Sequence, residues 1–156
     1  MLDFQWYKFS QLTTNQLYAI LALRTEVFIV EQKCAYADAD GRDYDALHLL
    51  GIEDHALVTY LRVFPPTEKA NIIVFGRVLT AQVARNKGYA KQLLQALLDY
   101  CDIHFPNIVI KCSAQCYLQK FYESFGFVAE GEPYEEDGIP HIAMKKPLRT
   151  LPIWQT

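Results

Sequence analysis

A short basic segment with one glycine stands immediately before a long apolar helix pattern in the middle of the chain. It reads Arg85-Asn86-Lys87-Gly88-Tyr89-Ala90. Backbone N–H groups at the start of a helix have no partner inside the helix, and together with the helix dipole they attract anions. Glycine lets a ligand approach the backbone closely. The segment therefore predicts a site for a phosphate group on the backbone of residues 85–90.

Two familiar phosphate-binding loops differ from this segment. In a Walker A loop the last glycine is followed by lysine and then by serine or threonine, whereas here Lys87 precedes Gly88. A Rossmann fingerprint has three glycines where this segment has one. Taken alone, the pattern Arg-x-x-Gly-x-Ala is also what a capped helix with exposed basic residues would show. The surrounding elements must therefore decide which phosphate compound it binds.

The hydrophobic pattern around the segment predicts alternating strands and helices. Alternating or continuous apolar runs predict strands at residues 3–9, 48–54, 56–64, 71–81, 107–113, 127–134 and 139–146. A first helix follows the capping residues 13–15, a second follows Gly88 and closes at Pro106, and a short third one ends at Gly126. The pair Asp137-Gly138 predicts a hairpin turn between the last two strands. This order predicts an α/β fold with a mixed sheet.

Composition excludes several classes of protein. The 156 residues have a formal net charge of -3, and 51% are hydrophobic and 21% charged, as in a globular domain. No uniform basic field is present, so we expect no nucleic-acid partner and no anionic membrane surface as partner. The chain lacks both an apolar run of about 18 residues and a signal-peptide layout, which predicts a cytoplasmic protein.

The residue spacings also predict that the chain holds no metal. The four cysteines contain no C-x-x-C pair, and no histidine pair of zinc spacing accompanies them. The acidic loop of residues 33–45 does not fit an EF-hand, because Leu49 stands at the twelfth position counted from Asp38, where that motif needs glutamate.

A second motif follows the basic segment after one predicted strand. It reads Phe121-Tyr122-Glu123-Ser124-Phe125-Gly126-Phe127. The two motifs, in this order, resemble the GNAT family of acetyl-CoA-dependent N-acetyltransferases from the first strand to about residue 146. The resemblance implies one domain over residues 1–156, with a core of about residues 3–146. It also implies a central mixed, mostly antiparallel sheet with helices on both faces.

A narrower likeness comes from two other stretches, RTEVFIVEQ (residues 24–32) and YEEDGIPH (residues 134–141). Together with Cys34, Asp40-Gly41, Asp43 and His48, they are similar to the ElaA subgroup of this family. The likeness narrows the fold more than the function, because no acceptor substrate follows from it. It leaves open whether the chain is a monomer or a homodimer.

The family resemblance assigns the coenzyme site. It places the pyrophosphate of acetyl-CoA on the backbone of Arg85, Asn86, Lys87, Gly88, Tyr89 and Ala90. It places the pantetheine arm and the thioester carbonyl on backbone groups of Val78, Leu79 and Thr80. Gln115 stands where many family members have an asparagine near the coenzyme, so this contact departs from the pattern.

Tyr122 matches the family tyrosine that protonates the leaving thiolate. Without the family its interpretation would be a core aromatic residue, because it shares an apolar face with Leu118, Phe121 and Phe125. The function that follows is transfer of an acetyl group from acetyl-CoA to an amine of a small molecule or peptide, by direct attack in a ternary complex. The alternative is a non-catalytic acyl-CoA-binding regulatory domain.

The acceptor amine must lose a proton before it attacks, and several residues are candidates for the base. His48 and His141 lie in predicted strands, and the acidic candidates are Glu31, Asp40, Glu135 and Glu136. The sequence does not select one of them. We also expect the acidic loop to line the rim of the acceptor site, where its negative charge would favour a cationic amine.

Arg24 lies on the same stripe of the first helix as Leu17, Ile20 and Val27. A charge on an apolar stripe must reach solvent or find a partner. Its guanidinium either pairs with Glu31, seven residues further along the stripe, or holds a carboxylate of the acceptor.

Overall fold

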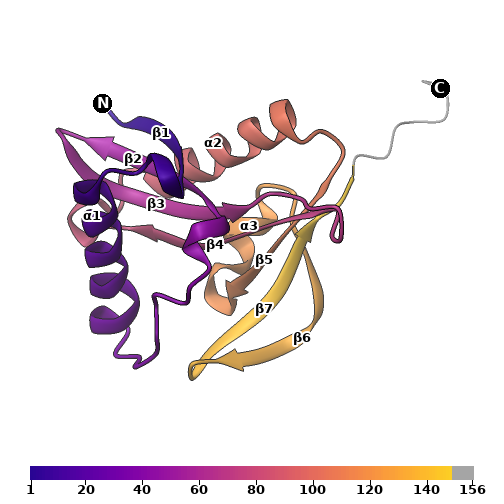
Figure 1. Cartoon of the computed structure of the whole chain (residues 1–156). Coiled ribbons are helices and arrows are strands. Elements are labelled where there is room, and N and C mark those ends of the chain that lie inside the picture. Colours follow the sequence, from indigo (N-terminus) through magenta and orange to yellow (C-terminus); the bar gives the residue numbers. More distant parts are fainter. Residues whose placement is uncertain (149–156) are drawn as a thin grey trace.

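Seven strands form one sheet in the order β1-β2-β3-β4-β5-β7-β6 in the computed structural model, which describes residues 1–148 (Figure 1). The strands are β1 (Asp3–Lys8), β2 (Leu47–Glu53), β3 (Ala56–Phe64), β4 (Ile72–Thr80), β5 (Val109–Gln115), β6 (Val128–Glu136) and β7 (Ile139–Lys146). All neighbouring strands are antiparallel except β4 and β5, which are parallel. The predicted mixed, mostly antiparallel sheet is confirmed.

The helical segments connect these strands in the predicted order. The α-helices are α1 (Thr14–Arg24), α2 (Tyr89–His104) and α3 (Gln119–Glu123). The π-helix η2 (Thr25–Glu31) continues α1, and single 3₁₀ turns are η1 (Phe9–Gln11), η3 (Asp43–Asp45), η4 (Gln82–Ala84) and η5 (Cys116–Leu118). Within residues 1–148, no helix is long and apolar enough to cross a membrane.

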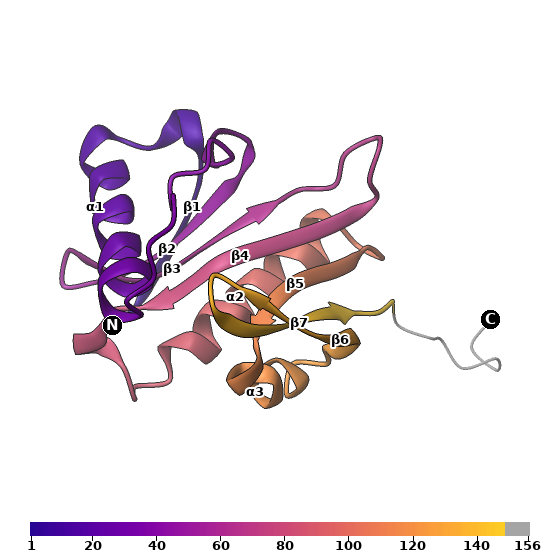
Figure 2. The ribbon, with the colours of Figure 1, turned by 90° about the horizontal axis from the view of Figure 1, so that it is seen from below.

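Helices cover both faces of the sheet. The side chains of each strand alternate between the faces, so each strand places apolar side chains against helices on both sides. On β2, Leu49 packs in one core cluster with α2 and α3, whereas its neighbour Leu50 packs in the other with α1 and η2. Leu61 and Tyr60 divide in the same way on β3. Figure 2 shows α1 on one side of the sheet and α2 and α3 on the other. The expected placement of helices on both faces is therefore confirmed.

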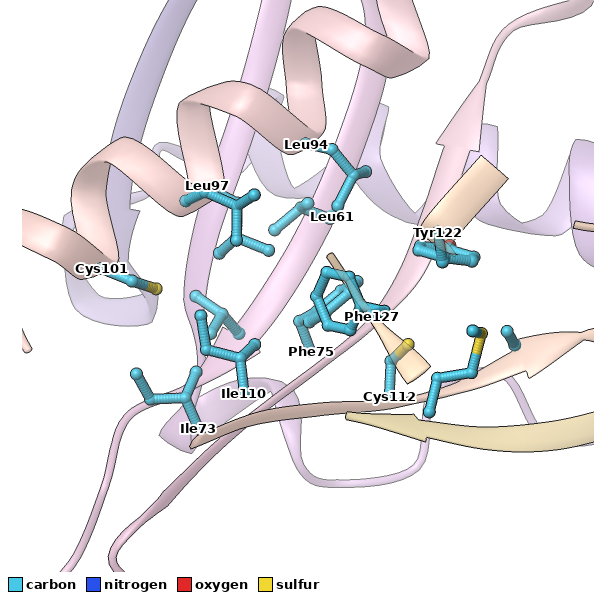
Figure 3. Close-up of a cluster of buried hydrophobic side chains, with 14 of the residues drawn as sticks. Leu61, Ile73, Phe75, Leu94, Leu97, Cys101, Ile110, Cys112, Tyr122 and Phe127 are labelled. Carbon is cyan, nitrogen blue, oxygen red and sulfur yellow. The ribbon is translucent and has the colours of Figure 1, made fainter. Parts of the chain in front are cut away.

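The larger core cluster lies under α2. The helix buries Leu93, Leu94, Leu97, Leu98 and Cys101, which recur at the helical period. In Figure 3, Leu94 and Leu97 project from α2 toward the sheet, where Leu61 and Phe75 lie. The packed face of α2 therefore begins at Leu93, one turn after the loop that follows β4.

The first helix begins as its sequence predicts but ends differently. The Thr13 hydroxyl accepts a hydrogen bond from Gln16 N at 3.1 Å, and the Gln16 side chain accepts one from Thr13 N, so a capping box starts α1. After Arg24 the helix continues as the π-helix η2, whose wider turns use i→i+5 hydrogen bonds. Residues beyond Arg24 therefore leave the stripe that a regular α-helix would give them.

Two irregularities of β4 shape the space beside it. On the β3 side, Tyr60 pairs with Leu79 and Arg62 with Gly76, so two residues of β4 oppose one of β3 and form a bulge. Arg77 occupies this bulge with φ +52°. On the β5 side, the parallel pairing covers only Ile72, Ile73 and Val74, after which the two strands separate. The backbone edge of β4 that faces β5 is open from there to Thr80.

Glycine is required at the head of α2 and at the hairpin turn. Gly88, the residue before α2, has φ +78°, and a Cβ placed there would meet no atom within 4 Å. Its backbone angle, rather than crowding, favours glycine. Asp137 and Gly138 have φ +52° and +78°, as expected for the predicted tight turn between β6 and β7.

Candidate active site

A cavity of about 1010 Å³ lies where β4 and β5 separate. Its walls come from β4, the loop before α2, β5, α3, η2 and the β6–β7 hairpin. The hairpin and the segment after η2 meet at one side of it, where the Cys34 thiol donates to the backbone carbonyl of Asp137 at 3.4 Å. Of the residues predicted for the site, those that line the cavity are Glu31, Asp40, Val78, Leu79, Thr80, Arg85, Asn86, Gly88, Tyr89, Ala90, Gln115, Tyr122, Glu136 and His141.

The loop before α2 turns its backbone toward the cavity through two left-handed residues. Asn86 has φ +64° and Gly88 has φ +78°. The first intrahelical bond of α2 runs from Gln92 N to the Gly88 carbonyl at 3.2 Å. The N–H groups of the residues before Gln92 therefore have no partner within the helix. N–H groups without a helical partner at the start of a helix are what a backbone anion site requires.

The two basic side chains of this loop are engaged elsewhere. The Arg85 guanidinium donates to both carboxylate oxygens of Glu31 at 2.7 Å, and its Nε donates to the Thr80 carbonyl at 3.1 Å. Lys87 is half-exposed, and its Nζ lies 3.7 Å from Glu53. The hydroxyl of Tyr89 also donates to the Glu53 carboxylate. The loop thus offers backbone groups to a ligand, while both of its cationic side chains have carboxylate partners.

Tyr122 lies on the cavity wall at the edge of the larger core. Its ring is 4% exposed and packs against Phe75, Phe121 and Phe127. Burial raises the pKa of the Tyr122 hydroxyl well above its usual value near 10. The two interpretations from the sequence, core aromatic residue and cavity hydroxyl, are therefore both compatible with its position.

A polar cluster from three strands lines the opposite part of the cavity. His141 of β7 stands across from Gln115 of β5 and from Tyr134 of β6. Its Nδ1 donates to the Ile139 carbonyl at 2.7 Å, and its Nε2 lies 3.3 Å from a carboxylate oxygen of Glu136. Ser113 of β5 bonds to the Tyr134 hydroxyl and lies 3.5 Å from Glu136.

His48 is part of the buried structure. It is 0% exposed, and its Nε2 lies 2.9 Å from the Asp43 carbonyl, to which it must donate. Its Nδ1 is then the acceptor for the Tyr60 hydroxyl at 2.7 Å. Burial lowers the pKa of His48, so the ring stays neutral. His48, one of the candidate bases, is therefore not available to an acceptor, because both ring nitrogens are bonded within the fold.

Arg24 is also part of the buried structure, with 0% exposure. Its Nε donates to the Asp38 carboxylate at 2.8 Å, its Nη1 to Asp43 at 2.6 Å, and its Nη2 to the Asp38 carbonyl at 2.9 Å. The predicted pair with Glu31 is wrong because the π-helix rotates Glu31 off the Arg24 face, and Glu31 bonds Arg85 instead. A contact from Arg24 to an acceptor carboxylate is excluded in this structure, because the side chain is fully buried and does not line the cavity.

Two strand arginines complete this ion cluster. Arg62 donates to Asp40 at 2.6 Å and to Asp43 at 2.9 Å. Arg77, turned by the β4 bulge, donates to the Asp38 carbonyl at 3.1 Å, and its Nε lies 2.9 Å from the Asp38 carboxylate at an angle that makes an ion pair rather than a hydrogen bond. Three arginines, Arg24 of α1, Arg62 of β3 and Arg77 of β4, therefore hold the acidic loop against the fold.

The expectation that this loop presents negative charge to an amine is accordingly wrong for its three inner carboxylates. The hydrogen bond from Arg62 holds the pKa of Asp40 well below its usual range. Burial alone would raise the pKa of Asp43, but the bonds and charges of Arg24 and Arg62 hold it below its usual range. The loop still contributes Tyr36, Asp40 and Arg42 to the cavity wall.

Comparison with known proteins agrees with this geometry. Residues 15–148 match the family described as the acetyltransferase (GNAT) domain. The chain belongs to the GNAT family. It is 42% identical to the protein ElaA of Escherichia coli over 148 residues, and these aligned residues make up 94% of this chain and 97% of that protein. The predicted resemblance to the ElaA subgroup is confirmed.

Solved structures of GNAT proteins are similar over nearly the whole chain. An acyl-CoA N-acyltransferase from Pseudomonas aeruginosa superimposes with a TM-score of 0.89 at 41% identity and covers 94% of this chain and 99% of that one. The structure of Escherichia coli ElaA gives a TM-score of 0.87 at 41% identity, with the same coverage. The family and these relatives indicate an acyltransferase that uses an acyl-CoA donor and an acceptor substrate.

Several residues of this GNAT site were missed in the sequence. Arg62 and Arg77 stand in strands that otherwise look apolar, and Ser113 and Tyr134 are single polar residues of β5 and β6. A signal for the arginines was present, since a buried charge needs an opposite charge and the loop carries four aspartates, three of which pair with the arginines. Their pairing, however, depends on long-range folding that the spacing does not show.

Proposed function

We propose that the protein transfers an acetyl group from acetyl-CoA to an amine of a small molecule or peptide by direct attack in a ternary complex. One observation carries the proposal. The loop of residues 85–90 and the ring of Tyr122 line the same cavity as the part of β4 that lies beyond its pairing with β5. A coenzyme bound by the loop would therefore reach the hydroxyl along this part of β4.

The loop and β4 would hold the donor by backbone groups. The pyrophosphate would lie on the N–H groups of Arg85 to Ala90, where the left-handed Asn86 and Gly88 turn the chain toward the cavity. The pantetheine arm would pair with the open edge of Val78, Leu79 and Thr80 as an additional strand. Gln115 lines the cavity across from this edge and would contact the same arm.

The reaction would proceed by attack of the amine nitrogen on the thioester carbon. A β4 backbone N–H directed at the carbonyl oxygen would stabilise the developing charge, which is worth about 3 kcal/mol per donor in other enzymes. The C–S bond then breaks, and the Tyr122 hydroxyl would give its proton to the departing thiolate. Burial raises the pKa of Tyr122, which keeps the hydroxyl protonated but also makes it a weaker acid toward a thiolate, whose ordinary pKa is near 8.5.

Two measurements test the proposal. Calorimetric titration with acetyl-CoA and with coenzyme A measures binding, and thiol release with a panel of primary amines, amino acids and peptides measures turnover. Micromolar binding with turnover of at least one amine is expected. Tight binding with no turnover on any amine would instead identify a non-catalytic acyl-CoA-binding domain. Comparing acetyl-CoA with longer acyl-CoA donors in the same assay establishes the acyl preference.

A further inference from the structure

The β6–β7 hairpin carries a histidine with one ring nitrogen fixed by the backbone. Nδ1 of His141 donates to the Ile139 carbonyl at 2.7 Å, so a neutral ring presents Nε2 as an acceptor. The ring stacks on Tyr134, with centroids 6.2 Å apart and planes 25° apart. His141 is largely buried yet lines the cavity, so its orientation is set by the fold rather than by solvent.

The neighbour of Nε2 is a second acceptor. A carboxylate oxygen of Glu136 lies 3.3 Å from Nε2, within ion-pair distance of an imidazolium but not aligned as a hydrogen bond. A neutral Nε2 and this oxygen are two acceptors side by side, so a donor that reaches both atoms would stabilise the pair. A substrate ammonium group supplies such a donor, because it has three N–H bonds and a positive charge.

We propose that His141 Nε2 takes a proton from the ammonium group of the acceptor while the Glu136 carboxylate holds that group and then the resulting imidazolium. This inference rests on the proposed acetyl transfer. It assigns the acceptor class as a primary amine that binds as a cation. It also assigns the acceptor side of the cavity to the face formed by β5, β6 and β7.

Protons and bonds balance in this scheme. The ammonium group loses one proton to His141, and the neutral amine forms the C–N bond to the thioester carbon. When the C–S bond breaks, the thiolate takes the proton of Tyr122, and the nitrogen returns one to the tyrosine oxygen. His141 finally releases its proton to solvent, so one amide, one thiol and one proton are the products.

The other candidate bases are engaged or lie elsewhere. His48 is buried with both nitrogens bonded. The hydrogen bond from Arg62 keeps the pKa of Asp40 low, and the hydrogen bond from Arg85 lowers that of Glu31, so both are weak bases. Glu135 is exposed and projects from the hairpin on the opposite face from Glu136. Among these candidates, His141 with Glu136 combines a free acceptor atom with a place on the cavity wall.

The surroundings of His141 add few competing charges. On β6 the titratable groups near it are Tyr134 and Glu136. The segment η5, which packs against β7, carries Cys116 and Tyr117. On β5 the nearest side chains, Ser113 and Gln115, are uncharged. The carboxylate of Glu136 is thus the charge that an imidazolium at this position would meet.

The test is a pH profile of kcat/KM for an amine that the wild-type protein acetylates. For His141→Gln we expect kcat/KM at pH 7 to fall about 100-fold, with acetyl-CoA affinity within twofold of wild type. The remaining rate should rise tenfold per pH unit, because only the free amine reacts, and added imidazole should restore part of it. For Glu136→Gln the acid limb of the profile should move to lower pH, because the imidazolium loses its partner.

Controls separate this assignment from the proposed function. Glu132→Gln removes an equal charge from an exposed position of the same strand and should leave the profile unchanged. Wild-type turnover together with an unaltered rate and profile in His141→Gln would overturn the assignment alone. Absence of wild-type turnover with every amine would overturn both. If His141→Gln folds poorly by circular dichroism, Glu136→Gln decides, and an unmoved acid limb in that variant contradicts the proposal.

Discussion

The carboxylate of Glu31 holds the guanidinium of Arg85 in a two-point ion pair, with both N–O distances at 2.7 Å. The pair joins the end of η2 to the loop in which we expect the coenzyme pyrophosphate to bind. It also lowers the pKa of Glu31, chiefly through the hydrogen bond from Arg85. A phosphate group bound in this loop would therefore compete with the Glu31 carboxylate for the same guanidinium and would be repelled by that carboxylate.

Substitution of Glu31 by glutamine should tighten coenzyme A binding. The change removes the competing carboxylate and leaves Arg85 available for a charge-assisted bond to phosphate. Because an exposed pair of this kind is worth about 1 kcal/mol or less, we expect a two- to fivefold lower Kd. The effect should diminish at high salt, since both side chains are partly exposed. Calorimetry at two ionic strengths measures both effects.

Glu26→Gln is the matched control for this variant, because Glu26 is an exposed acid of the same π-helix. It should leave the Kd unchanged. A weaker Kd in Glu31→Gln would mean that Glu31 positions the loop instead of competing for Arg85.

Substitution of Asp43 by asparagine should destabilise the fold strongly. Asp43 accepts hydrogen bonds from both Arg24 and Arg62, which are almost completely buried. Loss of the carboxylate leaves two buried cations with one partner fewer, and breaking such a cluster costs about 3–5 kcal/mol. Urea unfolding measures the loss, and Asp45→Asn, an exposed acid in the same turn, should lie within about 0.5 kcal/mol of wild type.

The pH dependence of unfolding checks the same cluster. The pKa values of Asp40 and Asp43 are held below their usual range, so their contribution to stability is complete above the ordinary carboxyl value near 4. It is lost as pH falls through the lower folded values. The wild type should therefore lose stability steeply below about pH 4, and Asp43→Asn should show a shallower decline. Equal slopes would contradict the role of this carboxylate.

Substitution of Gly88 by alanine should separate strain from coenzyme binding. The φ of +78° costs an alanine about 1–2 kcal/mol, although a Cβ there meets nothing within 4 Å. We expect that loss of stability together with a coenzyme Kd at least tenfold weaker, because the loop relaxes away from its anion-binding shape. Gly131→Ala has the same φ and equally open surroundings in β6. It should lose similar stability and keep its affinity, whereas equal weakening in both variants would contradict a direct role of Gly88.

The sequence was sufficient for features that depend on local chemistry. The apolar period of α2, the Thr13 cap and the Asp137-Gly138 turn each follow from a few neighbouring residues, and all three are found. The features in which the structure differs from the sequence-based predictions depend on residues that are distant in the chain. Arg24 finds Asp38 and Asp43 through a long loop, and the π-helix that redirects Glu31 has no periodic signal of its own.

The same distinction between local and distant residues applies to the candidate active site. The loop of residues 85–90, which we propose binds the coenzyme, could be singled out in the sequence because one short segment supplies its backbone groups. The cluster of Ser113, Tyr134, Glu136 and His141 could not, because it forms only when β5, β6 and β7 lie side by side. His141 is one of the two candidate histidines, and the structure distinguishes it because both ring nitrogens of His48 are bonded within the fold whereas His141 lines the cavity.

Substitution of Tyr122 by phenylalanine should lower kcat by about 100-fold and leave the Kd for acetyl-CoA unchanged, because the ring packing is kept and only the proton donor is lost. Since burial raises the pKa of Tyr122 above its usual value near 10, the wild-type hydroxyl stays protonated from pH 6 to 10, and the wild type should show no alkaline decline from this group. Tyr100→Phe removes a hydroxyl from a ring that stacks on Trp6, away from the cavity, and should keep wild-type kcat. Thiol-release kinetics across this pH range measure all three proteins, and a kcat for Tyr122→Phe within threefold of wild type would show that the thiolate leaves without a proton from this residue.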